Sequence, residues 1–146
     1  MHMCIDYRAL NKIIKKNSYT LLRIDEILND MAGAAIFSKI DLAHGYHQIR
    51  VRPEYLPKTA FQTQFGRFQF RVMPFGLCKA PATFQRTMNV LIADCRAFAR
   101  VYIGDIVVFS NTIEEHVEHL PIVIQKQRTE MLFAKRKKCL FAQAEI

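Results

Sequence analysis

The sequence lacks the segments that carry a protein into or across a membrane. No apolar run approaches the roughly 20 residues that a membrane-spanning helix needs. The first six residues lack the charged-then-apolar layout of a signal peptide. The four cysteines are scattered without a C-x-x-C pair, so zinc-binding spacing is absent and we expect reduced thiols. These absences predict an intracellular protein, cytoplasmic or nuclear, that makes no membrane contact.

Several common catalytic motifs are also missing. There is no glycine-rich phosphate loop and no G-x-S-x-G nucleophile elbow. His116 and His119 have the spacing of one helix face, and His44 and His47 repeat it, but no third metal ligand is evident. Each pair is therefore predicted to face solvent or to be hydrogen-bonded rather than to hold zinc.

Acidic residues are scarce beside basic ones. The chain has 13 Asp and Glu against 21 Lys and Arg, a net charge of +8. That sign suits a polyanionic partner such as nucleic acid, whose phosphates are bound by basic side chains. The basic residues form two clusters, at 12–16 and 126–138. A solvated surface without a partner would carry the same charge, so charge alone leaves both possibilities open.

The length and the apolar periodicity predict one α+β domain spanning residues 1–146. Helices are expected at residues 24–31, from Pro81, and from Thr112, which opens a T-x-x-E capping box. The third helix would kink or break at Pro121. Its predicted inward residues are Ile113, Val117, Leu120 and Ile124.

Alternating or continuous apolar stretches predict the strands. They are residues 35–42, 47–52, 59–65, 68–72, 131–134 and 139–142, and a hairpin across Gly104-Asp105. The expected layout is an antiparallel sheet with helices packed on one face.

Two of these strands carry an aspartate at one end, Asp41 and Asp105. Nucleotidyl transfer needs positioning and two divalent metals that stabilise the attacking and leaving oxygens. Mg²⁺ prefers oxygen ligands, and neighbouring strand ends hold carboxylates rigidly. Most strand-end aspartates only cap turns, however, so this pair is weak evidence by itself.

Six consecutive blocks of the sequence resemble reverse transcriptases, in particular those of gypsy-type long-terminal-repeat retrotransposon polyproteins. The blocks are Cys4–Asn11, Phe37–Leu42, Gly45–Ile49, Lys58–Phe61, Val72–Leu77 and Ala80–Gln85. The resemblance implies a fingers-and-palm fragment of an RNA-directed DNA polymerase. It implies Mg²⁺ as cofactor, and a primer–template of RNA or DNA and a deoxynucleoside triphosphate as partners.

The resemblance also assigns roles to individual residues. Asp41 matches the first metal-binding aspartate, and Asp105 matches the second aspartate of a Y-x-D-D box at residues 102–105. Arg8 matches an arginine near the template strand. Tyr46 matches the aromatic gate that discriminates against a 2′-hydroxyl. The full set of expected nucleotide-binding residues is Leu42, Tyr46, Phe75 and Gly76.

The chain departs from that pattern at several positions. Gly104 replaces the first aspartate of the box, and His2 stands where an arginine would grip the triphosphate. Thr20 and Leu22 replace prolines, and the chain ends at Ile146, before a thumb. The interpretation is a truncated polymerase domain with impaired or abolished catalysis and weakened metal binding. A non-catalytic nucleic-acid-binding module and a structural remnant without a partner remain as alternatives.

Overall fold

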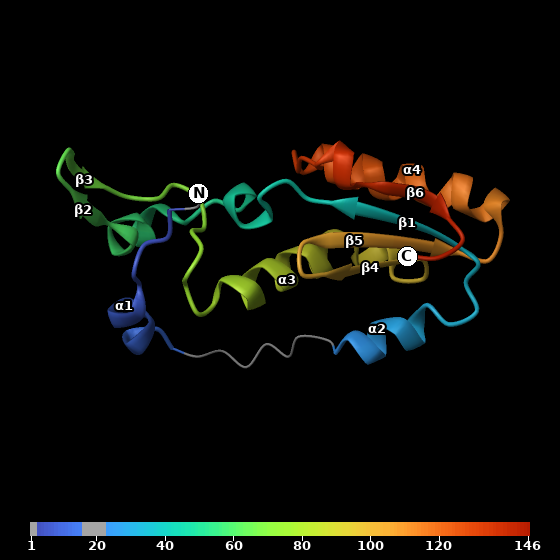
Figure 1. Ribbon diagram of the computed structural model, residues 1–146, viewed down its shortest axis with the longest axis horizontal. Helices are drawn as coiled ribbons and strands as arrows, with labels where there is room; N and C mark the ends of the chain where they lie inside the picture. Colours follow the sequence, from blue (N-terminus) through green and yellow to red (C-terminus); the bar gives the residue numbers. More distant parts are fainter. Residues whose placement is uncertain (1–2, 16–22) are drawn as a thin grey trace. The chain divides into compact units, whose positions relative to one another are not determined.

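The computed structural model describes residues 3–15 and 23–146 (Figure 1). His2, Thr20 and Leu22 lie outside these residues, as does Lys16 of the first basic cluster. The chain divides into two compact units. The first comprises Met1–Tyr19 and His44–Phe84, and the second comprises Thr20–Ala43 and Gln85–Ile146.

The second unit is built on a four-stranded sheet in the order β4-β5-β1-β6 (Figure 1). The strands are β1 (Ile36–Asp41), β4 (Ala99–Tyr102), β5 (Asp105–Ser110) and β6 (Leu140–Gln143). Each neighbouring pair is antiparallel. This confirms the α+β layout and the predicted strands at 35–42 and 139–142. The predicted strand at 131–134 is wrong, because Met131 adopts a positive φ of 54° and only Ala134 forms a bridge, to Leu42.

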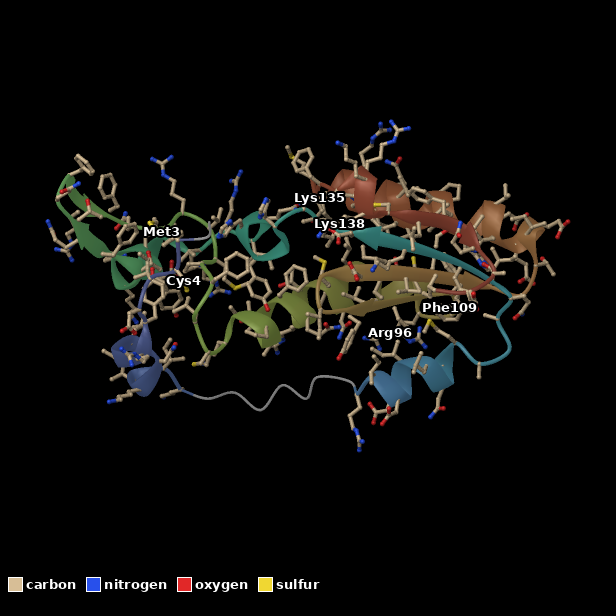
Figure 2. The ribbon with its side chains drawn as sticks, viewed as in Figure 1. Met3, Cys4, Arg96, Phe109, Lys135 and Lys138 are labelled. Atoms are coloured by element: carbon tan, nitrogen blue, oxygen red, sulfur yellow. The ribbon has the colours of Figure 1, made fainter. Side chains whose placement is uncertain are left out.

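Helices cover both sides of β5, which explains why its residues from Ile106 to Ser110 are all buried. On one face, Ser110 of β5 bonds to His116 of α4 (Ile113–Thr129). On the other face, Phe109 packs with Ile27 and the buried Met31 of the α2 segment (Ile24–Asp30). Figure 2 shows Phe109 on the side of the sheet that α2 covers. Thus α4 packs on one face as expected, and α2 adds cover to the opposite face.

The α4 helix begins at a side-chain cap, because Thr112 Oγ1 accepts a hydrogen bond from the Glu115 backbone N–H at 3.2 Å. The predicted break at Pro121 is wrong, since α4 continues through it to Thr129. The predicted inward stripe is also wrong. Ile113, Val117 and Ile124 are exposed and Leu120 is half-buried, whereas the buried residues are His116, Val123 and Gln127.

The reason for this error is that two stripes interleave on α4. Residues 113, 117 and 124 have helical spacing, but so do residues 116, 123 and 127. A buried polar side chain is tolerated when it finds hydrogen-bond partners in the fold. Gln127 donates from Nε2 to the Leu132 carbonyl at 3.0 Å, and His116 binds two serines. These partners are distant in sequence or in another element, so hydrophobicity alone selected the wrong face.

The first unit contains short elements. They are α1 (Arg8–Ile13), η1 (Gly45–Gln48), η2 (Pro53–Thr59), β2 (Phe61–Thr63) and β3 (Gly66–Phe68). The pairing of β2 with β3 confirms a hairpin here, although both strands are shorter than expected and the chain turns at residues 64–65, two residues before the predicted turn at Gly66-Arg67. The remaining elements belong to or extend into the second unit. They are α3 (Ala80–Leu91), η3 (Ala93–Cys95) and η4 (Arg136–Lys138).

The predicted strand at 47–52 is wrong. A 3₁₀ turn occupies residues 45–48, preceded by His44 at a φ of 48°, and only Arg50 forms a bridge, to Val72. Adjacent side chains of a strand point to opposite faces. Here Tyr46 and His47 both contact the ring of Phe75, with centroid distances of 5.2 and 4.9 Å. The 3₁₀ turn makes this shared contact possible.

None of the helices in residues 3–15 and 23–146 has the length and apolar character needed to cross a membrane.

Candidate functional site

The two predicted carboxylates meet at one end of the central sheet. Asp41, the last residue of β1, lies directly opposite Asp105, the first residue of β5. Directly opposed residues of antiparallel strands have Cβ atoms about 4.5–5.5 Å apart, and like charges there repel each other. The fold therefore brings together the two aspartates that the sequence singled out.

The hairpin beside this pair turns at Ile103 and Gly104, one residue earlier than predicted. Their φ angles are 43° and 94°, and Tyr102 pairs with Asp105 across the turn. Two positive φ values are the signature of a type I′ turn, which suits the right-handed twist of a two-residue hairpin. Glycine adopts this conformation readily, whereas a β-branched residue such as Ile103 is strained in it.

Backbone hydrogen bonds hold the end of β1 on both sides. The Leu42 N–H donates to the Gly104 carbonyl at 3.1 Å, and the Lys135 N–H donates to the Asp41 carbonyl at 2.7 Å. Lys135 and Lys138 lie beside the C-terminal end of β1 (Figure 2). Asp41 is therefore carried on a rigid backbone. Leu42 itself is buried, with its N–H already bonded.

A lysine shares the face of the carboxylate pair. Lys39 is two residues before Asp41 on β1, so both side chains point to the same side of the sheet. Lys39 Nζ lies 3.2 Å from Asp105 Oδ2, and the two side chains are 33% and 30% exposed. Sequence reasoning missed this contact. The period of two in the strand places Lys39 and Asp41 on one face and is the signal that could have found it.

The donor set at this end of the sheet does not fit a two-metal centre. Two Mg²⁺ ions require several oxygen ligands, of which carboxylates supply the negative charge. Here there are two aspartates, and Gly104 contributes no side chain. Within residues 3–15 and 23–146, no group of three or more Asp, Glu, His or Cys is placed to hold a metal ion.

The predicted aromatic gate lies in the first unit. The Tyr46 ring contacts Phe75 and Phe84, at centroid distances of 5.2 and 5.3 Å, and burial raises the pKa of its hydroxyl. The preceding Gly45 allows this approach, because a Cβ there would lie 2.9 Å from the Phe84 ring. Tyr46 and Phe75 are thus neighbours within the first unit.

Gly76 lies in a loop that Asn11 of α1 clamps. Asn11 Nδ2 donates to the Gly76 carbonyl and Asn11 Oδ1 accepts from the Cys78 N–H, both at 2.9 Å. Gly76 has a φ of 93°, which favours glycine. Phe75 is 41% exposed beside it. Sequence reasoning missed the role of Asn11. Asparagine is disfavoured in helix interiors because its side chain tends to hydrogen-bond to backbone groups. Its position in a short helix was therefore the sequence signal that could have suggested such a bond.

Arg8 is engaged with its neighbour Asp6. Arg8 Nη2 lies 2.6 Å from Asp6 Oδ2, and the Arg8 side chain is 88% exposed. The hydrogen bonds from Arg8 lower the pKa of Asp6 to about 2. Phosphate would have to compete with this carboxylate for the guanidinium group.

A hollow of about 730 Å³ in the first unit is lined by apolar and basic side chains. The basic residues are Lys15, Arg50, Arg52, Lys58 and Lys79. No acidic residue lines it among the described part of the chain. Its charge therefore favours an anion.

The His116 and His119 pair is hydrogen-bonded, as predicted. His116 is 2% exposed, with Nε2 lying 2.7 Å from Ser38 Oγ and Nδ1 lying 2.9 Å from Ser110 Oγ. His119 Nδ1 lies 2.8 Å from the same Ser110 Oγ. Burial, and then the charge of His119, lower the pKa of His116. The neutral ring thus joins α4 to two strands of the sheet.

The chain was compared with known protein families, proteins and structures. The family model described as reverse transcriptase (RNA-dependent DNA polymerase) matches residues 1–146. An RNA-directed DNA polymerase homolog of Oenothera berteroana is 46% identical over 127 residues, which are 84% of this chain and 89% of that protein. The Transposon Tf2-3 polyprotein of Schizosaccharomyces pombe is 38% identical over the whole chain, and that match spans only 11% of the polyprotein.

Solved structures agree in fold. The foamy viral protease–reverse transcriptase in complex with double-stranded DNA superposes with a TM-score of 0.90 at 24% identity, over 99% of this chain and 25% of that one. The native prototype foamy virus protease–reverse transcriptase gives 0.87 at 27% identity, over 97% of this chain and 19% of that one. The chain therefore spans a fifth to a quarter of these viral proteins.

Proposed function

This chain belongs to the reverse transcriptase (RNA-dependent DNA polymerase) family, and from that premise we propose that it is the fingers and palm of a retroelement polymerase whose nucleotidyl transfer is severely impaired. The second unit, with its four-stranded sheet, corresponds to the palm. The first unit, with the β2–β3 hairpin, corresponds to the fingers. The residues that bind nucleic acid and nucleotide are largely retained, and the metal site is incomplete.

The observation that carries this proposal is the register at the sheet end. Asp41 lies opposite Asp105, and the hairpin between β4 and β5 carries Gly104 beside them. Members of this family typically use divalent metals. Each metal contributes several kcal/mol of transition-state stabilisation. Because each 1.36 kcal/mol is tenfold in rate, loss of a principal ligand should cost roughly thousandfold or more.

Binding of a primer–template is supported by charge. The net charge is +8, and the hollow of the first unit collects five basic side chains without an acidic one among the described residues. Related foamy viral enzymes have been solved in complex with double-stranded DNA and with an RNA/DNA hybrid. Arg8 would contact the template strand after exchanging Asp6 for a phosphate.

Nucleotide contacts are assigned to the first unit and to the end of β1. Tyr46 would pack under the incoming sugar and exclude a 2′-hydroxyl, with Phe75 and Gly76 beside it. Leu42, the buried residue that follows β1, is assigned a nucleotide contact by the same resemblance. These assignments follow from the family resemblance together with the packing of Tyr46 on Phe75.

Primer extension on a primed RNA or DNA template tests the proposal, with Mg²⁺ or Mn²⁺ present. The chain should extend no more than an Asp41→Asn version. Extension clearly above that control would show that the two remaining aspartates suffice and that the proposed impairment is wrong.

The alternative is a nucleic-acid-binding module without catalysis. Filter binding to a primer–template duplex across a salt series separates it from a remnant that has no partner. For a nucleic-acid-binding module, the logarithm of the association constant falls linearly with the logarithm of the salt concentration, and the slope is set by the number of phosphates contacted. A remnant shows no saturable binding at low salt.

A further inference from the structure

The carboxylate pair already has a cation beside it. We propose that the Lys39 ammonium is the resident counter-ion of Asp105, on the face that Asp105 shares with Asp41, and competes with a divalent cation for Asp105. The inference rests on the proposed function only in taking these aspartates as the remnant of a metal site. Lys39 thereby sets how weakly the site binds metal, in addition to the loss of a ligand at Gly104.

The geometry supplies the first reason. Lys39, Asp41 and Asp105 all point to the same face of the sheet, because Lys39 is two residues from Asp41 and Asp41 is opposite Asp105. The Lys39 Nζ therefore reaches Asp105 diagonally across the strands, at 3.2 Å from Oδ2. A metal ion ligated by Asp105 would compete with this ammonium for the same oxygen atoms.

Charge supplies the second reason. Two carboxylates opposed across a ladder repel each other, and a cation on the same face offsets that repulsion. The three side chains sum to a charge of −1. A divalent ion is attracted to this set more weakly than to two or three carboxylates without a lysine. Both Lys39 and Asp105 are about two-thirds buried, so solvent screens their interaction less than it would at the surface.

No neighbouring group offers a better partner for Lys39 within the described residues. Arg100 of β4 lies on the same face, but it is paired with Asp30 at 2.8 Å and so does not replace Lys39 as the cation beside Asp105. Asp105 is the only acidic side chain within ion-pair distance of Lys39 in the described part of the chain. The contact is thus specific to this diagonal.

Mn²⁺ binding to the free protein, without nucleic acid or nucleotide, tests the inference. Isothermal calorimetry or the electron paramagnetic resonance signal of free Mn²⁺ gives the dissociation constant. Lys39→Met should tighten binding roughly tenfold or more, because it removes an adjacent positive charge. Lys39→Met with Asp105→Asn added should lose that gain.

Lys126→Met is the matched control. Lys126 is also ion-paired, with Nζ 2.5 Å from Asp94 Oδ2, and its loss changes the net charge by the same amount. The control should shift Mn²⁺ affinity by less than about twofold, because long-range charge effects are screened by salt. Equal tightening in the two variants, or none in Lys39→Met, would overturn the inference.

Separate measurements check the folding of the variants and the proposed function. If Lys39→Met does not fold by circular dichroism, Lys39→Gln is measured with the same criteria, since it keeps a polar group at the site. Binding to primer–template is assayed in parallel. Tighter Mn²⁺ binding by Lys39→Met without duplex binding would support this inference and contradict the proposed function. Duplex binding without tighter Mn²⁺ binding would support the proposed function and contradict this inference.

Discussion

Restoring a carboxylate at the hairpin turn is the most informative single change, and we predict that Gly104→Asp lowers stability in the absence of metal. Gly104 has a φ of 94°, and a Cβ built there would meet no atom within 4 Å. The cost is therefore conformational rather than steric. A non-glycine residue in this region costs about 1–2 kcal/mol, and a third carboxylate adds repulsion with Asp41 and Asp105.

The magnitude can be converted into a melting temperature. For a chain of this length, a loss of 1 kcal/mol lowers the midpoint by roughly 2–5 °C, so we expect the variant to melt about 3–8 °C below the parent without metal. A ligand at 100 times its dissociation constant stabilises by about 2.7 kcal/mol. Saturating Mn²⁺ should then raise the variant by more than the metal-free loss.

Thermal melts with and without Mn²⁺, followed by circular dichroism, measure both effects. Gly33→Asp is the matched control, because Gly33 has a φ of 87° and also has no atom within 4 Å of its built Cβ. It should lose similar stability and gain no metal response. A Gly104→Asp protein that melts like the parent, or that responds to Mn²⁺ no more than Gly33→Asp does, would refute the reasoning.

Three further predictions concern a buried histidine, the Gly76 loop and the apolar core. Burial lowers the pKa of His116 in the folded protein, so on acidification the unfolded chain takes up this proton at a higher pH than the folded protein does. The free energy of unfolding should therefore be highest above about pH 6.5 and fall as the pH drops towards 5. Urea midpoints should show this fall in the parent and not in His116→Gln. Asn11→Ala leaves the Gly76 carbonyl without its clamp and should cost about 1–2 kcal/mol, with faster amide exchange in that loop; unchanged exchange would contradict the clamp. Met88→Ala, at 1% exposure, should cost about 2–5 kcal/mol in urea unfolding, while Val90→Ala, at 72% exposure, should cost less than about 0.5.

Local sequence signals predicted much of the central sheet. The run from residue 35 to 42 forms β1, and the predicted hairpin forms β4 and β5. These segments are rich in β-branched and apolar residues, which favour strands that are buried on both faces of a sheet. The cap at Thr112 was also correct, since capping depends only on residues within one turn. In each case the signal that supported the prediction lies within a few neighbouring residues of the sequence.

Predictions failed where two patterns competed. The alternation at residues 47–52 is compatible with a strand, but contacts of Tyr46 and His47 with the distant Phe75 favour a 3₁₀ turn. The inward face of α4 was misassigned because Ser38 and Ser110, on separate strands, make burial of His116 favourable. Neither partner is visible from the local pattern.

Ordered motifs and strand periodicity are local properties of the chain, so they were enough to identify the family, the two aspartates at the strand ends and the glycine between β4 and β5. That Lys39 is the cation beside Asp105, and that α4 buries a histidine, became visible only in the packed fold. These outcomes depend on the register between strands and on which helix face meets the sheet. Register and face are fixed when distant segments pack together, so the pairing of Lys39 with Asp105 beside Asp41 is a property of the fold.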